Sequence, residues 1–421
     1  MSSPIKSNIA IIGGGLASLT LALSLHQRGI NCVIYEARPE DATTPGALML
    51  SPNSLRILDN LGVYARIRSQ GFNFQTVEFK NEKEETTDSY YLGSAAQYGY
   101  DCLRVYRQTL LLALRAAARA AAIPIHYSHK FSHITSEDPT TGVVTFELAN
   151  GLGTRTASLL VGADGIHSKV RQHHVAPGTA ATYGGRVAVT FATPRARAGL
   201  PDDYPAPFSI HGAGGAFVMA PQTPDGVSEL LAGTQIAFPE QDRAGWEALA
   251  ADKEKLAGLL QADAEGKWSV TPRKALEDIP LQTLGIWPFY FVPKLESWAS
   301  AREEGAGRVV VLGDAAHAIP PTAGQGASQA LEDAVTFAEL VGGFEGAGRE
   351  EWLKEVARWQ RYRQQRVDKV IVLTLQLNNT RLPAEERAKL KDGEMWQSSG
   401  DGELAWLYSA DIVRELREFE A

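Results

Sequence analysis

Three consecutive glycines, residues 13–15, separate two apolar runs near the start of the chain. The first run, 8–12, has the length of a buried strand. The second, 16–28, is apolar nearly all round, as in a helix that is covered on more than one side. Gly29 ends this helix, and another short apolar run follows at 31–35. The order strand, helix, strand predicts parallel pairing with a right-handed crossover, and therefore an α/β fold.

The glycine turn has the features of a dinucleotide-binding site. Glycine at Gly13 permits a tight turn, and Gly15 lets a pyrophosphate approach the backbone at the helix N-terminus, where free amides and the helix dipole attract negative charge. Glu36 follows the second strand, where an acid can bind a ribose hydroxyl. Ser18 replaces the third glycine of the usual pattern, so we expect slightly looser packing of helix on strand. The motif alone does not distinguish NAD from FAD.

The rest of the chain divides by the type of element that its residues predict. Up to about Pro177, and again near 308–341, the pattern continues that of a parallel α/β domain, with helices expected at 52–61, 108–122 and 324–341 and strands at 125–127, 143–148, 158–162 and 308–312. Between these parts lie short strands split by Gly- and Pro-rich turns, at 187–191, 208–211, 216–220 and 229–236. Such strands predict a separate antiparallel sheet.

We therefore predict an α/β protein with a Rossmann-like domain, a smaller antiparallel-sheet domain and C-terminal helices. The Rossmann-like domain is discontinuous, with segments 1–75, 101–177 and 285–345. The smaller domain, which would cover a substrate, takes 76–100 and 178–284. Residues 346–421 form the helical segment, with a polar loop near 392–402.

Composition excludes several classes of function. The formal net charge of −8 argues against a nucleic-acid surface or an anionic membrane as the main partner. Cys32 and Cys102 are the two cysteines in 421 residues, too few for a disulfide framework or a thiolate metal site. None of the histidines has the spacing of a metal-ligand pair, so we expect no metal. The longest apolar stretch, 9–25, is short for a membrane span and is interrupted by glycine, so we expect a soluble, cytoplasmic protein.

A second glycine cluster favours flavin over nicotinamide. Asp314 stands at the carboxyl end of the strand predicted at 308–312, where an acid can hydrogen-bond a ribityl chain. Gly324 and Gly326 then open a helix, and its free amides can stabilise the negative charge of a reduced flavin ring. The cofactor would span two helix N-termini, whereas an NAD dehydrogenase needs the first alone. The glycines at 212–215 precede a strand and not a helix, so no second nucleotide unit is expected.

Five motifs occur in a fixed order between about residues 9 and 341. They are the glycine turn with Glu36, segments 45–53 and 104–110, GADGIHSKVR at 162–171, and GDAAHAIPPTAGQGASQALEDA from Gly313. In these motifs the sequence resembles the single-component FAD-dependent monooxygenases of the aromatic hydroxylase class, which include salicylate and p-hydroxybenzoate hydroxylases and fungal biosynthetic relatives. The resemblance does not extend to 178–300 or to the tail.

The resemblance implies contacts with FAD at individual positions. Glu36 corresponds to the adenosine-ribose ligand, and Ala47 to the backbone position that meets the flavin. Arg107 corresponds to the arginine near the ribityl-phosphate region, and Asp164 to the Asp-Gly motif tied to FAD and transient NAD(P)H binding. Asp314 corresponds to the acid on the ribityl or pyrophosphate side. The residues implied around the flavin ring are Pro321, Gly324, Gly326 and Ala327.

Some of these residues have a purely structural alternative. Arg107 could begin a helix and pair with an acid, and Asp164 could belong to a plain turn. His317 is expected to be a packed or backbone-bonded histidine and not a proton shuttle. The aromatic cluster at 287–291 could face the substrate or pack in the core, and the sequence favours neither.

Activation of the substrate requires a further residue. A phenol would benefit from a cation or a base that stabilises phenolate. Arg186, at the start of a covering strand, is the expected catalytic residue because some relatives have an arginine there, and His211 is a weaker candidate. The family's more common aromatic-arginine pattern is replaced by Val189 and Thr190.

The function implied by the resemblance is hydroxylation, or epoxidation, of an electron-rich aromatic or indole-like small molecule. NAD(P)H would visit briefly and reduce FAD, O2 would form a flavin C4a-hydroperoxide, and the protein would position the substrate and exclude water. Alternatives are an FAD-dependent dehydrogenase or epoxidase of secondary metabolism, and a non-catalytic nucleotide-binding protein. We expect a monomer or a homodimer, with no nucleic acid and no stable membrane association.

Overall fold

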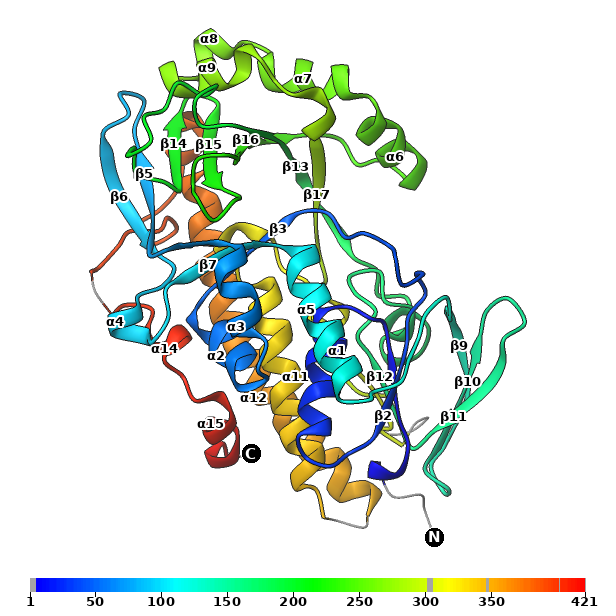
Figure 1. Cartoon of the computed structure of the whole chain (residues 1–421). Coiled ribbons are helices and arrows are strands. Elements are labelled where there is room, and N and C mark those ends of the chain that lie inside the picture. Colours follow the sequence, from blue (N-terminus) through cyan, green and yellow to red (C-terminus); the bar gives the residue numbers. More distant parts are fainter. Residues whose placement is uncertain (1–4, 301–305, 346–347, 401, 421) are drawn as a thin grey trace.

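A five-stranded parallel sheet forms the centre of the protein (Figure 1). The computed structural model describes residues 5–300, 306–345, 348–400 and 402–420. The strand order is β18-β12-β1-β2-β8. Their bounds are β1 (Ile9–Ile12), β2 (Cys32–Tyr35), β8 (Ile125–His126), β12 (Leu159–Gly162) and β18 (Val309–Val311). Every residue of β1 is buried, as expected for a strand covered on both faces.

Helices cover this sheet. The first crossover helix, α1 (Leu16–His26), packs between α11 (Gly326–Gly343) and α5 (Arg107–Ala120). The apolar residues of α1 lie on all its sides because it has neighbours on both flanks. Helix α2 (Pro52–Asn60) packs on α11, and α12 (Arg349–Thr380) packs on its other side. The elements predicted for the parallel domain are confirmed to within two residues at their ends, although the strand at 143–148 pairs in an antiparallel sheet.

Two small antiparallel sheets flank the parallel one. The first has the order β11-β10-β9, with β9 (Phe131–Asp138), β10 (Val143–Leu148) and β11 (Gly153–Ala157). The second has the order β3-β7-β4, with β3 (Ala47–Leu50), β4 (Phe72–Phe74) and β7 (Cys102–Tyr106). Of these strands, β10 alone was predicted from the sequence. The second sheet matters for the site because β7 leads directly into α5.

A seven-stranded, mostly antiparallel sheet forms the second large unit, in the order β17-β13-β16-β15-β14-β5-β6. It confirms the predicted second sheet and draws on three separate parts of the chain. Helices α6 to α9 cover its outer face, while the inner face looks toward the parallel domain (Figure 1). The bounds are β5 (Thr76–Lys80), β6 (Thr86–Tyr91), β13 (Thr182–Thr193), β14 (Phe208–Gly212), β15 (Gly215–Pro221), β16 (Leu230–Ala237), β17 (Gly285–Phe291), α6 (Arg243–Ala251), α7 (Lys253–Gln261), α8 (Ala264–Lys267) and α9 (Val270–Glu277).

Strand β17 differs from the predicted domain boundary. We placed residues 285–345 with the parallel domain, but β17 pairs with β13 of the seven-stranded sheet, with Ala188 opposite Trp287. The sequence around Trp287 carries no period that would reveal its partner. The chain therefore returns to the parallel domain after β17 and not before it.

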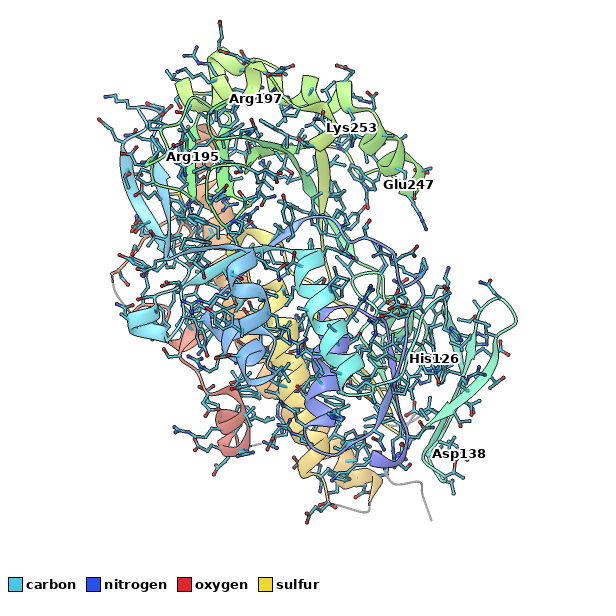
Figure 2. All side chains as sticks on the ribbon, viewed as in Figure 1. His126, Asp138, Arg195, Arg197, Glu247 and Lys253 are labelled. Carbon is cyan, nitrogen blue, oxygen red and sulfur yellow. The ribbon has the colours of Figure 1, made fainter. Side chains whose placement is uncertain are left out.

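Helix α12 connects the two large units. It runs past α11 and reaches the seven-stranded sheet near β14 and β15 (Figure 1). Side chains fill the spaces between the ribbons throughout (Figure 2). None of the described helices combines the length and the apolar character that a bilayer-spanning segment needs. Short helices complete the described chain: α3 (Tyr64–Ile67), α4 (Ala95–Tyr98), α10 (Asp314–His317), α13 (Ala384–Arg387), α14 (Ala405–Tyr408) and α15 (Ile412–Glu418).

A buried ionic cluster joins α12 to α11. The Arg363 guanidinium lies 2.6 Å from a Glu332 carboxylate oxygen and 2.8 Å from an Asp333 oxygen, and Arg366 is 2.9 Å from Glu332. Burial by itself would raise the pKa of Glu332, but Arg366 and Arg363 outweigh it and lower the pKa to about 2. Asn53 of α2 donates a further hydrogen bond to Glu332 at 2.7 Å. Because both acids are paired and hydrogen-bonded, this cluster holds the three helices in one arrangement.

Candidate functional site

The glycine turn lies where β1 ends against β12. Gly13 has a φ of +105°, and its amide donates a hydrogen bond of 2.9 Å to the Tyr35 carbonyl. A methyl group at Gly13 would lie 2.5 Å from the carbonyl oxygen of Ala163, so both space and backbone conformation require glycine. At Gly15, the N-cap of α1, a methyl group would meet nothing within 4 Å. The helix N-terminus thus opens into free space, which suits an approaching anionic group.

Glu36 places its carboxylate against this turn. It accepts hydrogen bonds from the amide of Gly14 and from the amide of Arg38, the latter at 2.7 Å. The predicted spacing therefore brings the acid to the glycine turn. Ser18, in place of the third glycine, is buried, and its hydroxyl donates to the Ala163 carbonyl at 3.3 Å. That bond compensates for the looser packing expected of serine.

Asp164 follows β12 and lies beside Gly13. One carboxylate oxygen accepts hydrogen bonds from the amides of Lys169 at 2.8 Å and Val170 at 3.3 Å. The other oxygen is buried and has no hydrogen-bond partner among the described residues. Burial raises the pKa of Asp164. An unsatisfied buried carboxylate oxygen is costly, and this one adjoins the glycine turn at the start of α1; a role for Asp164 beyond the turn stays a prediction.

The second glycine cluster follows β18. Asp314 begins α10 and its side chain is exposed. Residues Pro321–Ala323 form a single 3-10 turn, η5, which ends at Gly324 with a φ of +67°. Helix α11 begins two residues later at Gly326, where a methyl group would again meet nothing within 4 Å. The N-termini of α1 and α11 therefore both open into free space, with glycine at each opening.

Arg107 connects the two halves of this region. Its amide donates to the Gly46 carbonyl at 2.9 Å, because β3 and β7 pair with Ala47 opposite Tyr106. The guanidinium carbon lies 5.7 Å from the centre of the Trp287 ring, and the Nε is buried without a partner. Burial lowers the pKa of Arg107, while the negative charge of Asp314 opposes this shift. Arg107 thus has hydrogen-bonding capacity to offer a bound group between α5, β17 and Asp314.

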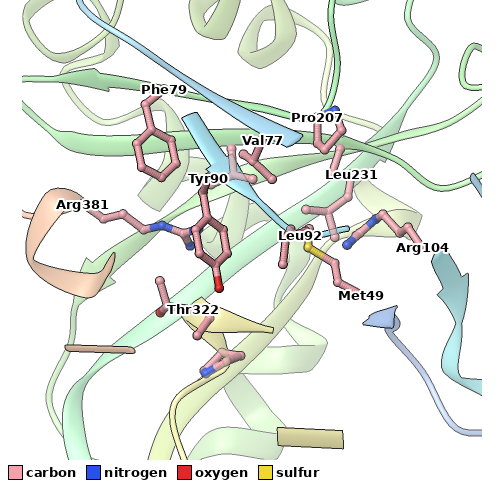
Figure 3. A pocket seen from close by; sticks show the side chains of 14 residues that line it. Met49, Val77, Phe79, Tyr90, Leu92, Arg104, Pro207, Leu231, Thr322 and Arg381 are labelled. Carbon is pink, nitrogen blue, oxygen red and sulfur yellow. The ribbon is translucent and has the colours of Figure 1, made fainter. Parts of the chain in front are cut away.

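A cavity of about 100 Å³ lies between η5 and the inner face of the seven-stranded sheet (Figure 3). We call it the inner cavity. Most of its lining is apolar, and three of its residues, Pro321–Ala323, belong to η5. The residues that line it are Met49, Val77, Phe79, Tyr90, Leu92, Arg104, Pro207, Val218, Ala220, Leu231, Pro321, Thr322, Ala323 and Arg381.

Two arginines line this mostly apolar cavity, and neither of them was predicted from the sequence to have a role. Arg104 of β7 is 5% exposed, and its Nε donates to the side-chain oxygen of Gln222 at 2.9 Å. Arg381 follows α12, and its Nε is buried without a partner. Burial lowers the pKa of each arginine to about 10. The sequence signal for Arg104 was its place in the motif at 104–110, but nothing local marked Arg381.

The residues expected to activate a substrate lie elsewhere. Arg186 of β13 does not line the inner cavity; its guanidinium lies 3.1 Å from a carboxylate oxygen of Glu386. Its ion pair lies outside the inner cavity, so the catalytic role expected for Arg186 stays a prediction. His211 is absent from the lining as well, and burial, followed by the charges of Arg381 and Arg387, lowers its pKa to about 3.

Two remaining alternatives can be compared with the structure. His317 is buried, and its Nε2 lies 2.5 Å from an Asp333 oxygen, which also accepts a hydrogen bond of 2.8 Å from the Gly313 amide. It is therefore a packed histidine that helps to fix the loop before Asp314. The aromatic cluster is divided, because Phe289 is 7% exposed and packs inward, whereas Trp287 is 49% exposed and faces Arg107.

Comparisons with known proteins agree with this geometry. A family model described as "FAD binding domain" matches residues 6–268 and 297–372. The 3-amino-4-hydroxybenzoate 2-monooxygenase PtnB3 of Streptomyces platensis is 27% identical over 415 residues, with 97% of each chain covered. Salicylate hydroxylase of Pseudomonas putida is 28% identical over 433 residues, with 98% of this chain and 94% of the relative covered. The crystal structure of CtdE in complex with FAD and a substrate has a TM-score of 0.76 at 20% identity, with 98% and 97% of the chains covered.

Proposed function

Since the chain belongs to the FAD binding domain family, we propose that it is an FAD-dependent monooxygenase that uses NAD(P)H and O2. The substrate class is an electron-rich aromatic or indole-like small molecule, which is hydroxylated or epoxidised. Relatives that align over nearly the whole chain are named as monooxygenases of aminohydroxybenzoate and as a hydroxylase of salicylate. Because these relatives align with both large units, their similarity supports the same type of reaction in this chain, and not merely the same cofactor-binding fold.

The observation that carries the proposal is the pair of open helix N-termini, of α1 and α11, with Arg107 close enough to Asp314 to interact with its charge. Gly13 and Gly15 at the start of α1 would hold a pyrophosphate, with Glu36 on the adenosine ribose. Asp314 would hold the ribityl side, and Arg107 has an unpartnered Nε directed to the same region. Both openings are unobstructed, since a methyl group at Gly15 or at Gly326 would meet no atom within 4 Å. These residues fit FAD.

The flavin ring would be held by residues of the second glycine cluster. When bound, FAD supplies the redox chemistry with NAD(P)H and O2. The residues proposed around its ring are Ala47, Pro321, Gly324, Gly326 and Ala327, and Asp164 is proposed to serve FAD and the visiting NAD(P)H. The chain's own contribution is to orient the substrate ring in the inner cavity and to keep water away from it, which its apolar lining supports.

We also propose a cytoplasmic location and a monomeric or homodimeric state. Cys32 and Cys102 are both buried and unbonded, and burial raises the pKa of the Cys32 thiol to about 12. Thiols kept protonated and covered in this way are compatible with a reducing compartment. Size-exclusion chromatography with light scattering measures the oligomeric state directly.

The experiment is reconstitution of the purified chain with FAD, followed by oxygen-dependent NAD(P)H oxidation with a panel of aromatic compounds. We expect a bound flavin spectrum and stimulation of NAD(P)H oxidation by some ring compounds, with an oxygenated product. The Asp314→Ala variant should lose most bound FAD while remaining folded. Asp278→Ala is the matched control, because that exposed carboxylate lies on the outer unit and pairs with Arg197 at 3.1 Å.

Each alternative function has its own outcome in this experiment. A dehydrogenase would reduce FAD with its substrate and release no oxygenated product. A non-catalytic nucleotide-binding protein would bind the cofactor without stimulated turnover. A chain that takes up no FAD at all would overturn the proposal, and full flavin occupancy in Asp314→Ala would remove Asp314 from the cofactor site.

A further inference from the structure

The inner cavity contains positive charge that the described part of the protein does not neutralise. We propose that it is an anion subsite in which Arg381 and Arg104 hold a small aromatic carboxylate. This assignment rests on the proposed function, because it names the substrate class of that same site. Figure 3 shows the two guanidinium groups pointing inward from opposite sides of the cavity, with Tyr90 between them.

The first argument is the lack of an acidic partner. Among the described residues, no carboxylate forms an ion pair with either arginine, although sixteen ion pairs are found elsewhere. The groups whose negative form would raise the pKa of either arginine are Tyr90 near Arg381, and Cys102 and Tyr106 near Arg104. Burial raises the pKa of all three, so they are neutral at physiological pH. Buried charges are normally paired, and an anionic ligand would complete both.

The second argument is the hydrogen-bonding geometry of each guanidinium. The described residues offer the side chain of Arg381 no hydrogen-bond acceptor, and its Nε is buried without a partner. The Nε is covered, but no described acceptor uses the two terminal nitrogens, so these remain available to the oxygens of a carboxylate. Arg104 already uses its Nε on Gln222, so it retains its terminal nitrogens for a single acceptor such as a ring hydroxyl or phenolate oxygen.

A chain of polar contacts fixes Arg104 for this task. Gln222 accepts from Arg104 at 2.9 Å, and the Tyr106 hydroxyl donates to the Glu229 carboxylate and is also within hydrogen-bonding reach of Gln222. Arg104 and Tyr106 lie on β7, while Gln222 and Glu229 lie at the turn between β15 and β16. The guanidinium is therefore held in place before a ligand arrives, which reduces the entropy lost on binding.

The third argument is the size and the chemistry of the remaining lining. The cavity volume of about 100 Å³ is somewhat below that of a ~150 Å³ cavity known to hold benzene, so a single ring with a carboxylate enters it when side chains of the lining move aside. Side chains such as Phe79, Leu92 and Leu231 provide apolar walls for a ring. Pro321 lines the cavity and also belongs to the segment proposed around the flavin ring. A ring held by the two arginines therefore lies next to the residues proposed to hold the cofactor.

The test compares carboxylates with their neutral amides on the FAD-reconstituted protein. The probes are benzoate with benzamide, and 2- and 4-hydroxybenzoate with 2- and 4-hydroxybenzamide, titrated while the flavin absorbance is recorded. We expect at least one acid to bind about 10-fold or more tightly than its amide. Arg381→Gln should weaken binding of that acid by about 10- to 100-fold, the usual effect of losing a charged hydrogen-bonded partner. Binding of the amide should change less than twofold.

Further variants separate the two arginines and control for net charge. Arg381→Lys keeps the charge but loses the planar edge, so it should fall between the wild type and Arg381→Gln. Arg104→Gln should weaken hydroxybenzoates more than benzoate. Arg197→Gln is the matched control, because it removes one positive charge from an exposed site on the outer unit (Figure 2) and should leave all affinities unchanged.

Two results would overturn the subsite: equal binding of acids and amides by the wild type, or an equal loss of both in Arg381→Gln. Failure of the proposed function has a different signature, because the protein would then take up no FAD or release no oxygenated product. In the absence of flavin, titration calorimetry with the same acid and amide pairs measures the anion subsite directly. Its outcome does not depend on turnover.

Discussion

Replacing Arg381 by methionine should make the protein more stable while weakening its binding of aromatic acids. Methionine keeps a long unbranched side chain to fill the space of the arginine stem, but removes the charge. Burial lowers the pKa of Arg381 from the ordinary value of an arginine to about 10. At 1.36 kcal/mol per pKa unit, keeping this group protonated in the folded state costs about 3 kcal/mol.

The sign of this effect follows from protonation linkage. The folded-state pKa of Arg381 lies below the unfolded value, so the folded protein disfavours the charged form. The destabilisation is complete below pH 10 and disappears only as the pH rises to the ordinary pKa of an arginine. At neutral pH the free energy of unfolding of the methionine variant should therefore be about 2–3 kcal/mol higher than that of the wild type. The gain is smaller than the full cost of the charge because some packing of the side chain is lost.

Urea unfolding of the FAD-reconstituted protein at pH 7, with and without a saturating aromatic acid, measures both effects. The acid at 100 times its dissociation constant should stabilise the wild type by about 2.7 kcal/mol and the variant by much less. Arg197→Met is the control, since loss of an exposed ion pair should change stability by less than about 1 kcal/mol.

A methionine variant that is less stable than the wild type without ligand would refute this reasoning. It would mean that Arg381 contributes to the fold itself, through a partner outside the described residues or through its packing. A variant with unchanged stability and unchanged response to the acid would remove Arg381 from the anion subsite. The two outcomes are distinct because stability and ligand response are read in the same titration.

Three further predictions concern the helix cluster and the glycine turn. Arg363→Met leaves Glu332 and Asp333 buried without their shared cation, so urea unfolding should show a loss of about 3–5 kcal/mol. In the folded protein the pKa of Glu332 is lowered from 4.5 to about 2, which corresponds to a contribution of about 3 kcal/mol to the free energy of unfolding. This contribution is complete above pH 4.5 and is lost as the pH falls toward 2. Unfolding experiments over this pH range should therefore show a smaller loss of stability in Glu332→Gln than in the wild type. Gly14→Ala would place a methyl group 2.8 Å from the Glu36 carboxylate, so bound FAD, measured by absorbance, should fall while the circular dichroism spectrum is retained.

Local patterns in the sequence predicted the parallel domain and its glycine turn well. The strand at 8–12, the glycines at 13–15 and Glu36 lie within thirty residues, so their spacing alone determines their relative positions. The short strands after Pro177 also showed themselves, because alternation and turn residues are local signals. Strand β17 was assigned to the wrong unit, since its pairing with β13 depends on a register that no local pattern encodes.

The residues that would bind the substrate could not be identified in this way. Arg186 was expected to act on the substrate because some relatives have an arginine there, yet its guanidinium lies 3.1 Å from the carboxylate of Glu386, a residue 200 positions later. Arg104 belonged to a recognised motif, but its approach to the inner cavity depends on the pairing of β7 with β3 and on Gln222. Arginines on strands and at helix ends look alike in a sequence. Their surroundings, and not their spacing, separate a surface cation from a ligand-binding one.

Helix α12 and the residue after it show how that separation works. Arg363 and Arg366 lie within the helix and are each paired with buried acids of α11, so their charges are neutralised inside the fold and stabilise its arrangement. Arg381 follows the same helix and is partly exposed, with its Nε covered, and no described acid pairs with it. A folded chain has no stability reason to keep an unpaired cation that is partly withdrawn from water, because an apolar side chain of similar length would be better tolerated there. Its retention in the inner cavity is best explained by a charge that arrives with the substrate.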